Sequence, residues 1–349
     1  METKLYYVSE SNSSSLLEEA ASIIRSGGLV VFPTETVYGL GADATNPDAT
    51  SKIYAAKGRP SDNPLIIHIS SPEDAERYAF TNSTYYTLAE KFMPGPLTVI
   101  LAAKSTVPLT TRGGLDTVAV RCPENKIARE LILLSDVAIA APSANLSGSP
   151  SPTSFEHAYL DMNGRVDAII NGGDCDFGLE STIVSLNNDG TLTLLRPGKI
   201  TKEDIEAIGL KVSIADAVTN MLREGEVAIS PGMKYRHYAP KSPVILLDGS
   251  KEAIASYLQK HSSQEKRIAV IAYEDDADYI SSVVNDIDIY KFGKRSDEAK
   301  QAHLLFKLLR DTDKENYAVI YAPLPERKGI GLALYNRMIR AAAHNIIRL

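Results

Sequence analysis

The chain has 349 residues, more than one ordinary domain contains and about the number expected for two. Hydrophobic residues make up 44% and charged residues 23%, which is typical of a soluble globular protein with a buried core. The net charge of −7 argues against a protein that holds nucleic acid through its overall charge, although a local basic cleft stays compatible with it.

The two cysteines, Cys122 and Cys175, do not have a metal-binding spacing, and so small a number argues against a disulfide scaffold. The N-terminal residues do not resemble a secretion signal, and no apolar run reaches the length of a membrane span. These observations predict a cytoplasmic protein in a reducing compartment that is not attached to a membrane.

The first half of the chain predicts a mixture of strands and helices. The predicted elements are, in chain order, a helix over 14–26, a strand over 29–32, a polar turn at 34–36, a helix capped by Asn46 that ends at Lys57, a strand over 65–69, helices from Ser71 and Asn82, strands over 97–103 and 117–121, a helix over 124–135, strands over 137–141, 166–170 and 181–186, and a helix over 201–208. We expect the glycine-rich residues between the polar turn and Asn46 to form a connection.

The second half follows a different pattern. Residues 209–242 contain one short amphipathic piece at 216–224 and then a proline- and tyrosine-rich stretch, which predicts a linker. Beyond the linker, strands (243–247, 267–272, 287–292 and 317–321) alternate with helices (250–260, 276–284, 296–310 and 330–343). This alternation predicts a smaller parallel α/β, Rossmann-like domain. The predicted division is therefore a catalytic domain over 1–208, a linker or lid over 209–242 and a C-terminal domain over 243–349.

Lys57 and Arg59 are two cations around a glycine, directly after a predicted helix. They could compensate the dipole at the end of that helix, which is a common role for cations there. The polar residues that follow, Ser61, Asp62 and Asn63, favour instead a site for a polyphosphate, because fixed cations and loop donors suit such a ligand.

Ser143 and Asn145 follow an apolar strand, at the kind of position where open α/β sheets bind ligands, although ordinary turn chemistry explains them as well. Arg121 shares one face of its strand with Thr117, and it could form either a structural salt bridge or a clamp for a carboxylate. His68 could be a core histidine or a functional one.

Other candidates have weaker support. Glu35 and Glu180 each precede a threonine or serine near a strand end, but without a third element they do not define an acid–base pair. His237 has no neighbour in a zinc-binding pattern, and nothing in the sequence indicates a covalent nucleophile. From the residues alone, the first domain is an anion-binding α/β domain with several polar strand ends.

Several motifs together resemble the YrdC-type threonylcarbamoyl-AMP synthase family, in particular its long form with an additional C-terminal domain. The motifs are FPTETVYGLG at 32–41, KGRPSDNPL at 57–65 with His68 after it, PGPLT at 94–98, PSAN at 142–145, EST at 180–182 and RPG at 196–198. The paired family signature, Lys-x-Arg with a later Ser-x-Asn, is intact. The linker stretch SPGMKYRHYAP (230–240) and the ending GIGLALYNRMIRAA (329–342) are similar to the long form too.

The resemblance implies a fold, a reaction and a set of roles. The fold is a twisted, mostly open sheet with flanking helices around a deep cavity. The reaction joins L-threonine, bicarbonate and ATP into threonylcarbamoyl-AMP and pyrophosphate, for transfer to tRNA by downstream machinery and without stable tRNA binding by this chain. Mg²⁺ would enter with ATP, and no protein ligand for it can be named.

The implied roles fall into four groups. Threonine would be held by Thr36, His68, Arg121, Ser181 and the backbone of Ala141. The phosphates would be held by Lys57, Arg59, Asn63, Ser143, Asn145 and Arg196, of which Lys57, Arg59, Ser143 and Asn145 count as catalytic. Thr117 and Ser151 would lie along the nucleotide, and Tyr235 would belong to a lid.

Three alternative readings remain open. One is an RNA-binding module with a basic cavity and no ATP turnover. Another is a carbamoyl-transfer domain of the kind found in hydrogenase-maturation enzymes, although this chain lacks their acylphosphatase and zinc-finger segments. A third treats the C-terminal domain as a separate enzyme, but without a recognisable phosphate loop a regulatory or lid-supporting role fits better.

Overall fold

The structure is a computed structural model that describes residues 2–9, 13–220, 230, 238–262 and 267–349. The chain divides into two compact units. The first comprises Met1–Ser147 and Ser151–Lys234, and the second comprises Gly148–Pro150 and Tyr235–Leu349. The short segment Gly148–Pro150 therefore belongs with the C-terminal unit, where the Arg310 side chain donates to the carbonyl of Pro150 and the Ala239 amide donates to that of Gly148.

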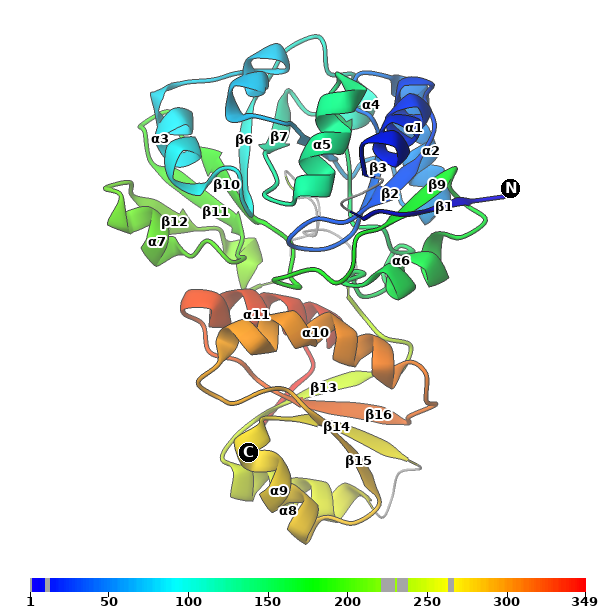
Figure 1. Ribbon diagram of the computed structural model, residues 1–349. Coiled ribbons are helices and arrows are strands. Elements are labelled where there is room, and N and C mark those ends of the chain that lie inside the picture. Colours follow the sequence, from blue (N-terminus) through cyan, green and yellow to red (C-terminus); the bar gives the residue numbers. More distant parts are fainter. Residues whose placement is uncertain (1, 10–12, 221–229, 231–237, 263–266) are drawn as a thin grey trace. The chain divides into compact units, whose positions relative to one another are not determined.

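The first unit is built on a mixed sheet, to which the described residues contribute twelve strands (Figure 1). Eleven of them lie in the order β1-β9-β2-β3-β8-β4-β7-β6-β10-β11-β12, and β5 pairs with β6. The strands are β1 (Lys4–Tyr7), β2 (Val30–Phe32), β3 (Gly39–Asp43), β4 (Ile66–His68), β5 (Ala79–Phe80), β6 (Leu97–Ala103), β7 (Thr117–Arg121), β8 (Ile139–Ala140), β9 (Ala168–Asn171), β10 (Thr182–Leu186), β11 (Leu192–Arg196) and β12 (Val212–Ile214).

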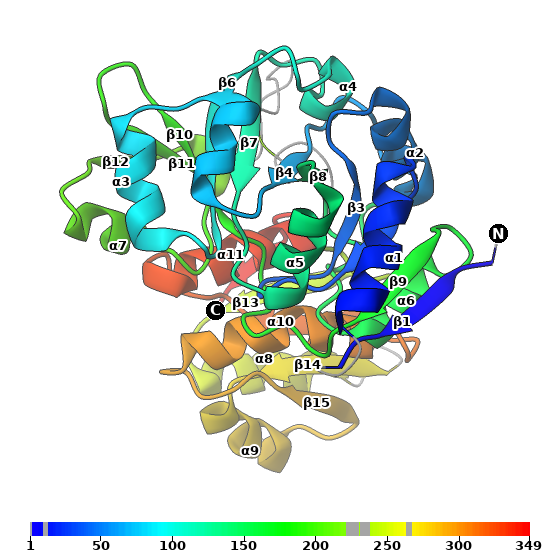
Figure 2. The ribbon, with the colours of Figure 1, turned by 45° about the horizontal axis from the view of Figure 1, so that its top comes forward.

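The helices of this unit flank the sheet. They are α1 (Ser13–Arg25), α2 (Pro47–Lys57), α3 (Ser83–Phe92), α4 (Leu109–Arg112), α5 (Lys126–Ser135), α6 (Phe155–Met162) and α7 (Lys202–Ala207), with the 3-10 turns η1 (Pro72–Arg77) and η2 (Asp216–Val218). Figure 2 shows α1 and α5 side by side across the strands. Leu17 and Ile24 of α1 and Leu131 of α5 are buried with Phe32 and Ile170 of the sheet, so this face carries an apolar core of the unit.

The start of α2 forms as its sequence predicts. The Asn46 side chain accepts hydrogen bonds from the amides of Asp48 and Ala49, and Pro47 occupies the first turn, where a missing N–H costs nothing. The helix ends at Gly58, whose φ of 61° lies in the left-handed region that glycine adopts easily. This cap fixes where Lys57 and Arg59 leave the helix.

The glycine-rich connection after the polar turn contains a strand, which corrects the prediction of a plain connection. β3 runs antiparallel to β2, with Val31 opposite Leu40. A Cβ at Gly41 would come within 2.7 Å of the Phe32 ring and the Ile139 side chain, so the strand needs glycine for close packing. Glycine weakens the sequence signal for a strand, because it is usually depleted there.

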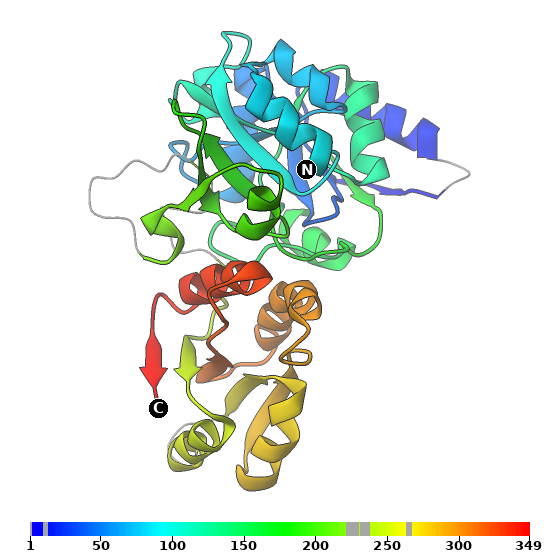
Figure 3. The same cartoon turned by 90° about the vertical axis from the view of Figure 1, so that its left-hand side faces the viewer.

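The second unit contains a separate sheet of five described strands in the order β15-β14-β16-β13-β17, with every neighbouring pair parallel. The strands are β13 (Val244–Asp248), β14 (Ile268–Ala272), β15 (Ile287–Lys291), β16 (Val319–Pro323) and β17 (Ile346–Arg348), and the helices are α8 (Lys251–Ser262), α9 (Glu274–Val283), α10 (Glu298–Thr312) and α11 (Gly329–Ala341). Figures 1 and 3 show α8 and α9 on one face of this sheet and α10 and α11 on the other.

The prediction of two α/β parts, the second built on a parallel sheet, is confirmed. Short strands at sheet edges, such as β1, β12 and β17, were not predicted, because three or four residues carry little periodic signal. Within 216–224, only the 3-10 turn η2 lies in the part of the chain that the structure describes, since residues 221–229 fall outside it.

Candidate active site

A tight polar turn follows β2 at Thr34-Glu35-Thr36, and all three side chains are buried. The Thr34 hydroxyl donates to the carbonyl of Val37 over 2.6 Å, and it accepts from the amides of Thr36 and Val37. Such a side-chain-to-backbone turn fixes the direction of its central residue. Glu35 is thereby held inside the protein, only 3% exposed.

Arg121, at the end of β7, reaches this turn. Its Nη2 donates to Glu35 Oε1 over 2.7 Å and to the Thr36 hydroxyl over 2.9 Å, and both charged side chains are about 95% buried. The pair is incomplete, because Arg121 Nε and Glu35 Oε2 are buried and lack a hydrogen-bond partner among the described residues. Buried polar groups without partners are costly, so these two atoms mark a place for a ligand.

His68 lies beside Arg121, since the two residues are in register on the parallel strands β4 and β7. Burial, followed by the charge of Arg121, lowers the pKa of His68 from 6.5 to about 3. The imidazole is therefore neutral at physiological pH, and its Nδ1 lacks a partner within the described part of the chain. A neutral ring can accept or donate one hydrogen bond to a bound ligand without adding charge.

The depressed pKa of His68 predicts a loss of stability in mild acid. The unfolded chain binds a proton near pH 6.5, whereas the folded protein resists it until about pH 3. The contribution of His68 to the free energy of unfolding should therefore fall by up to about 1.4 kcal/mol per pH unit as the pH drops between these values. Urea titrations at pH 7 and pH 5 should show a smaller pH dependence in His68→Gln than in the wild type. Equal pH dependence in both proteins would contradict the assignment.

Ser181, just before β10, continues the site on the other side of Arg121. Thr98 of β6 is opposite Arg121 in the sheet, and its hydroxyl lies 2.7 Å from that of Ser181. Arg196, the last residue of β11, donates to the carbonyl and the hydroxyl of Ser181 at 2.9 and 3.0 Å. The structure thus places Arg196 next to Ser181, a residue predicted to bind threonine.

The paired signature of Lys57 with Ser143 and Asn145 is assembled by direct contact. Lys57 is 3% exposed, and its Nζ donates to the backbone carbonyls of Ser143 and Asn145, the latter over 2.6 Å. The Ser143 hydroxyl lies 2.5 Å from Asn145 Oδ1, and the Ser147 amide donates to the carbonyl of Lys57. Lys57 therefore positions the Ser143–Asn145 turn in addition to carrying a charge there.

Arg59 and Asn63 lie at the other end of β4. The Arg59 guanidinium donates to the carbonyls of Asn63 and Pro64. Asn63 is 1% exposed, yet neither end of its amide finds a partner within the described ranges. A buried amide with both a free donor and a free acceptor is the second place in this unit that points to a polar ligand.

The remaining predicted residues are more scattered. Thr117 begins β7 and Arg121 ends it, so the two lie about 13 Å apart at opposite ends of the strand. The Ala141 amide donates to the backbone carbonyl of Ile66. The Ser151 hydroxyl donates to the buried carboxylate of Glu180 over 2.5 Å. Tyr235 lies outside the described residues. The structure therefore groups Thr36, His68, Arg121, Ser181 and Arg196, and separately Lys57, Ser143 and Asn145.

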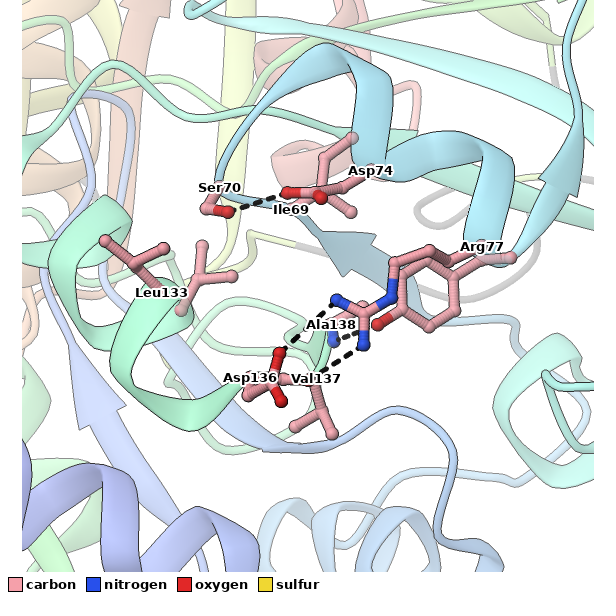
Figure 4. Close-up of a pocket in the computed structure, with 10 residues that line it drawn as sticks. Ile69, Ser70, Asp74, Arg77, Leu133, Asp136, Val137 and Ala138 are labelled. Atoms are coloured by element: carbon pink, nitrogen blue, oxygen red, sulfur yellow. Dashed lines mark hydrogen bonds and ion pairs between the residues drawn. The ribbon is translucent and has the colours of Figure 1, made fainter.

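A different pocket of about 110 Å³ opens between η1, α5 and the residues 136–138 that precede β8 (Figure 4). Its polar side chains are paired with one another or with backbone: Ser70 bonds to Asp74, Arg77 bonds to Asp136, and the Tyr78 hydroxyl accepts from the Ala138 amide. None of the predicted site residues that the structure describes lines it. With its charges satisfied, this pocket gives little reason to expect a polar substrate.

Sequence reasoning set Glu35 aside because no third element defined an acid–base pair, and it gave Thr98 no role in the site. The partner of Glu35 is Arg121, 86 positions away, and a contact over that separation leaves no local pattern. In the described part of the chain, no cluster of three or more His, Cys, Asp or Glu side chains could hold a metal ion. Nor does any described helix combine the length and apolar character needed to cross a membrane.

The fold and this site define the class: an α/β protein with a YrdC-type first domain and a distinct C-terminal domain. A family model described as "Telomere recombination", for Sua5, YciO and YrdC, matches residues 22–198. A second model, described as the C-terminal domain of threonylcarbamoyl-AMP synthase, matches residues 200–343. The chain belongs to the threonylcarbamoyl-AMP synthase family, whose members are nucleotidyltransferases.

The similarity to known relatives covers nearly the whole chain. The threonylcarbamoyl-AMP synthase of Pyrococcus abyssi is 43% identical over 95% of both chains, and that of Bacillus subtilis is 42% identical over the full length of both. The crystal structure of P. abyssi Sua5 complexed with L-threonine superposes with a TM-score of 0.91 at 40% identity, covering 99% of this chain and 100% of the other.

Proposed function

We propose that this chain joins L-threonine, bicarbonate and ATP into threonylcarbamoyl-AMP and pyrophosphate, the first step of threonylcarbamoyladenosine synthesis on tRNA. The observation that carries the proposal is the buried Arg121–Glu35 pair, in which one donor and one acceptor have no partner among the residues that the structure describes. An α-amino acid supplies both complements, a carboxylate for the guanidinium and an amino group for the carboxylate. A structural salt bridge alone would be expected to pair both sides of the guanidinium fork.

The protein needs to position the substrates and neutralise their charge, because the carbamate of threonine is itself the nucleophile that attacks the α-phosphorus. We assign the threonine site to Arg121, His68, Thr36 and Ser181, with a backbone contact from Ala141. Arg121 would hold the carboxylate of threonine. The neutral imidazole of His68 would contribute a hydrogen bond but no second charge beside Arg121.

The ATP site takes the other predicted residues. We assign the phosphates to Arg59, Asn63, Arg196 and the turn Ser143–Asn145, which Lys57 holds in place. Thr117 and Ser151 would lie along the nucleotide, and Tyr235 stays a prediction. Mg²⁺ would arrive bound to the triphosphate as part of the substrate.

The wider assignments belong to the same proposal. Residues 1–208 would form the catalytic domain, 209–242 the linker and 243–349 a supporting or regulatory domain. The product would pass to tRNA threonylcarbamoyl-transfer machinery. The buried, free thiols of Cys122 and Cys175 are in keeping with a reducing compartment such as the cytoplasm.

Isotope tracing tests the reaction. Purified protein is incubated with ATP, Mg²⁺, threonine and ¹³C-bicarbonate, and the nucleotides are separated and their masses are determined by mass spectrometry. The proposal expects a threonylcarbamoyl-AMP that carries one ¹³C atom and disappears when any substrate is left out. A threonyl-AMP without the labelled carbon would instead indicate direct amino-acid activation and would contradict the proposal.

Asn63 offers a test of the ATP site that separates binding from folding. Replacing Asn63 with leucine removes two buried polar atoms that lack partners in the described part of the chain, so the folded protein should be at least as stable as the wild type. The KM for ATP should nevertheless rise about 10- to 100-fold, the value of a lost hydrogen bond to a charged group. Threonine affinity should not change.

The matched control is Asn46→Ala on α2. Asn46 is a helix cap with its side-chain oxygen satisfied, so its loss should lower stability by about 1 kcal/mol and leave the KM for ATP unchanged. If Asn63→Leu destabilised the protein and kept the wild-type KM, Asn63 would be a structural residue.

A further inference from the structure

Three neighbouring residues each bury one polar atom that lacks a partner in the described residues: Glu35 Oε2, Arg121 Nε and His68 Nδ1. Glu35 and Arg121 are joined by a 2.7 Å ion pair, and Arg121 is in register with His68 on the adjacent strand. Each of the three residues is at most 4% exposed. Leaving three polar atoms unmatched in one buried cluster is costly unless a ligand completes them.

The hydrogen-bonding chemistry of the unmatched atoms indicates which ligand group each of them can bind. Arg121 Nε–H is a donor and suits the carboxylate of an amino acid. Glu35 Oε2 is an acceptor, and in an amino acid only the amino group, or a side-chain hydroxyl, can donate to it. Because Oε1 of the same carboxylate is bonded to Arg121, a carboxylate bound by Arg121 brings its own α-amino group close to Glu35.

We propose that Glu35 is a further catalytic residue of this site: its Oε2 binds the α-amino group of threonine and takes the proton that this nitrogen must lose before it becomes a carbamate. The inference rests on the proposed function, and it names the general base of that reaction. A buried carboxylate already held by Arg121 and the Thr34 turn needs no rearrangement to act.

The step balances as follows. The ammonium group of threonine gives one proton to the Glu35 carboxylate and becomes a free amine. The nitrogen lone pair then forms a bond to the carbon of bicarbonate, a C–O bond breaks, and the leaving hydroxide combines with the second amine proton to give water. The products are the carbamate of threonine, water and a protonated Glu35, which returns its proton to solvent in the same turnover.

The other titratable groups around Glu35 are poor candidates for this base. The pKa of His68 is lowered to about 3 by burial and by Arg121, because a protonated imidazole would place a second positive charge beside the guanidinium. Burial raises the pKa of the Cys122 thiol to about 12 and that of Cys175 above its usual range, so both stay protonated. Arg121 carries a fixed positive charge.

Glu35→Gln tests the proposal, because glutamine keeps an oxygen for Arg121 but cannot take a proton. The rate of pyrophosphate release at saturating substrates should fall about 10²- to 10⁴-fold at pH 7. The remaining rate should rise about tenfold per pH unit between pH 7 and pH 9, as free amine becomes available, and this slope should be steeper than that of the wild type. A loss of rate with the wild-type slope would mean that Glu35 only positions Arg121, and an unchanged rate would overturn the proposal outright.

A binding experiment reads out the contact with the amine without any turnover. The probe is 2,3-dihydroxybutanoate, in which a hydroxyl replaces the α-amino group of threonine. Calorimetry on the wild type should show at least a tenfold preference for threonine over the probe, and Glu35→Gln should lose most of that preference. Equal preference in both proteins would place the amino group away from Glu35.

Three controls separate the possible failures. Circular dichroism reports whether Glu35→Gln is folded. Glu35→Asp keeps the negative charge, so it should recover part of the rate of pyrophosphate release and the wild-type dependence of that rate on pH. Glu180→Gln alters another buried carboxylate, one that accepts from Ser151, and should keep the wild-type slope whatever its rate. A wild-type protein that releases no pyrophosphate would defeat the proposed function, whereas an active wild type with an equally active Glu35→Gln would defeat only this inference.

Discussion

Replacing Arg121 with lysine should lower kcat/KM for threonine about 100-fold or more. Lysine keeps the positive charge that Glu35 needs, so the protein should fold. A single ammonium group cannot, however, bond to Glu35, to Thr36 and to a substrate carboxylate in the geometry of the planar guanidinium. Losing one partner of a buried, charged interaction costs about 3–5 kcal/mol, which corresponds to a decrease of about 100-fold or more in kcat/KM.

The measurement is threonine affinity by calorimetry, together with pyrophosphate release over a range of threonine concentrations. Arg129→Lys is the matched control, because Arg129 lies on α5 and donates to the backbone carbonyl of Ser70 at the protein surface. Threonine affinity within threefold of the wild type in Arg121→Lys would show that Arg121 is a structural ion pair and does not contact the substrate.

Replacing Lys57 with methionine should reduce pyrophosphate release at least 100-fold and also lower the melting temperature. Methionine fills a similar volume but cannot donate to the carbonyls of Ser143 and Asn145, which would stay buried without this bond. The turn that carries two predicted phosphate ligands would lose its anchor. Because positioning is the main source of rate in phosphoryl transfer, a small displacement of this turn should be costly.

Lys52→Met provides the control on the same helix. Lys52 also donates to a backbone carbonyl, but to that of Gly27, which follows α1. It should change pyrophosphate release less than twofold. If Lys57→Met were destabilised yet retained wild-type turnover per folded molecule, Lys57 would support the fold alone, and the predicted catalytic role would be wrong.

Local sequence features predicted much of what positions this site. The Asn46-Pro47 cap located the start of α2 to the residue, and the alternation over 117–121 correctly gave a strand. The alternation of strand and helix patterns beyond residue 243 was sufficient to predict that the C-terminal sheet is parallel. Each of these signals depends on residues within a few positions of one another.

The features that were missed depend on distant residues. β3 was predicted as a connection because its glycines weaken the strand signal. These glycines are needed because the Phe32 ring of the neighbouring strand packs closely against them, and no local pattern reveals this contact. Lys57 was predicted to bind a polyphosphate, but its hydrogen bonds to the backbone carbonyls of residues 86 and 88 positions away were not predicted. The sequence left open whether Arg121 forms a salt bridge or binds a substrate. The structure contains the salt bridge and also leaves Arg121 Nε unmatched in the described residues.

The most direct test of the account is pyrophosphate release from ATP by the purified wild-type chain, with threonine and bicarbonate each supplied or withheld. The account predicts release only when both are present, with a rate that saturates in threonine, because the amino acid must complete the cluster of Glu35, His68 and Arg121 before the α-phosphorus is attacked. Release at the full rate without threonine would contradict it, since the acceptor of the adenylate would then be another molecule. No release under any combination, in a folded protein, would contradict the synthase function itself.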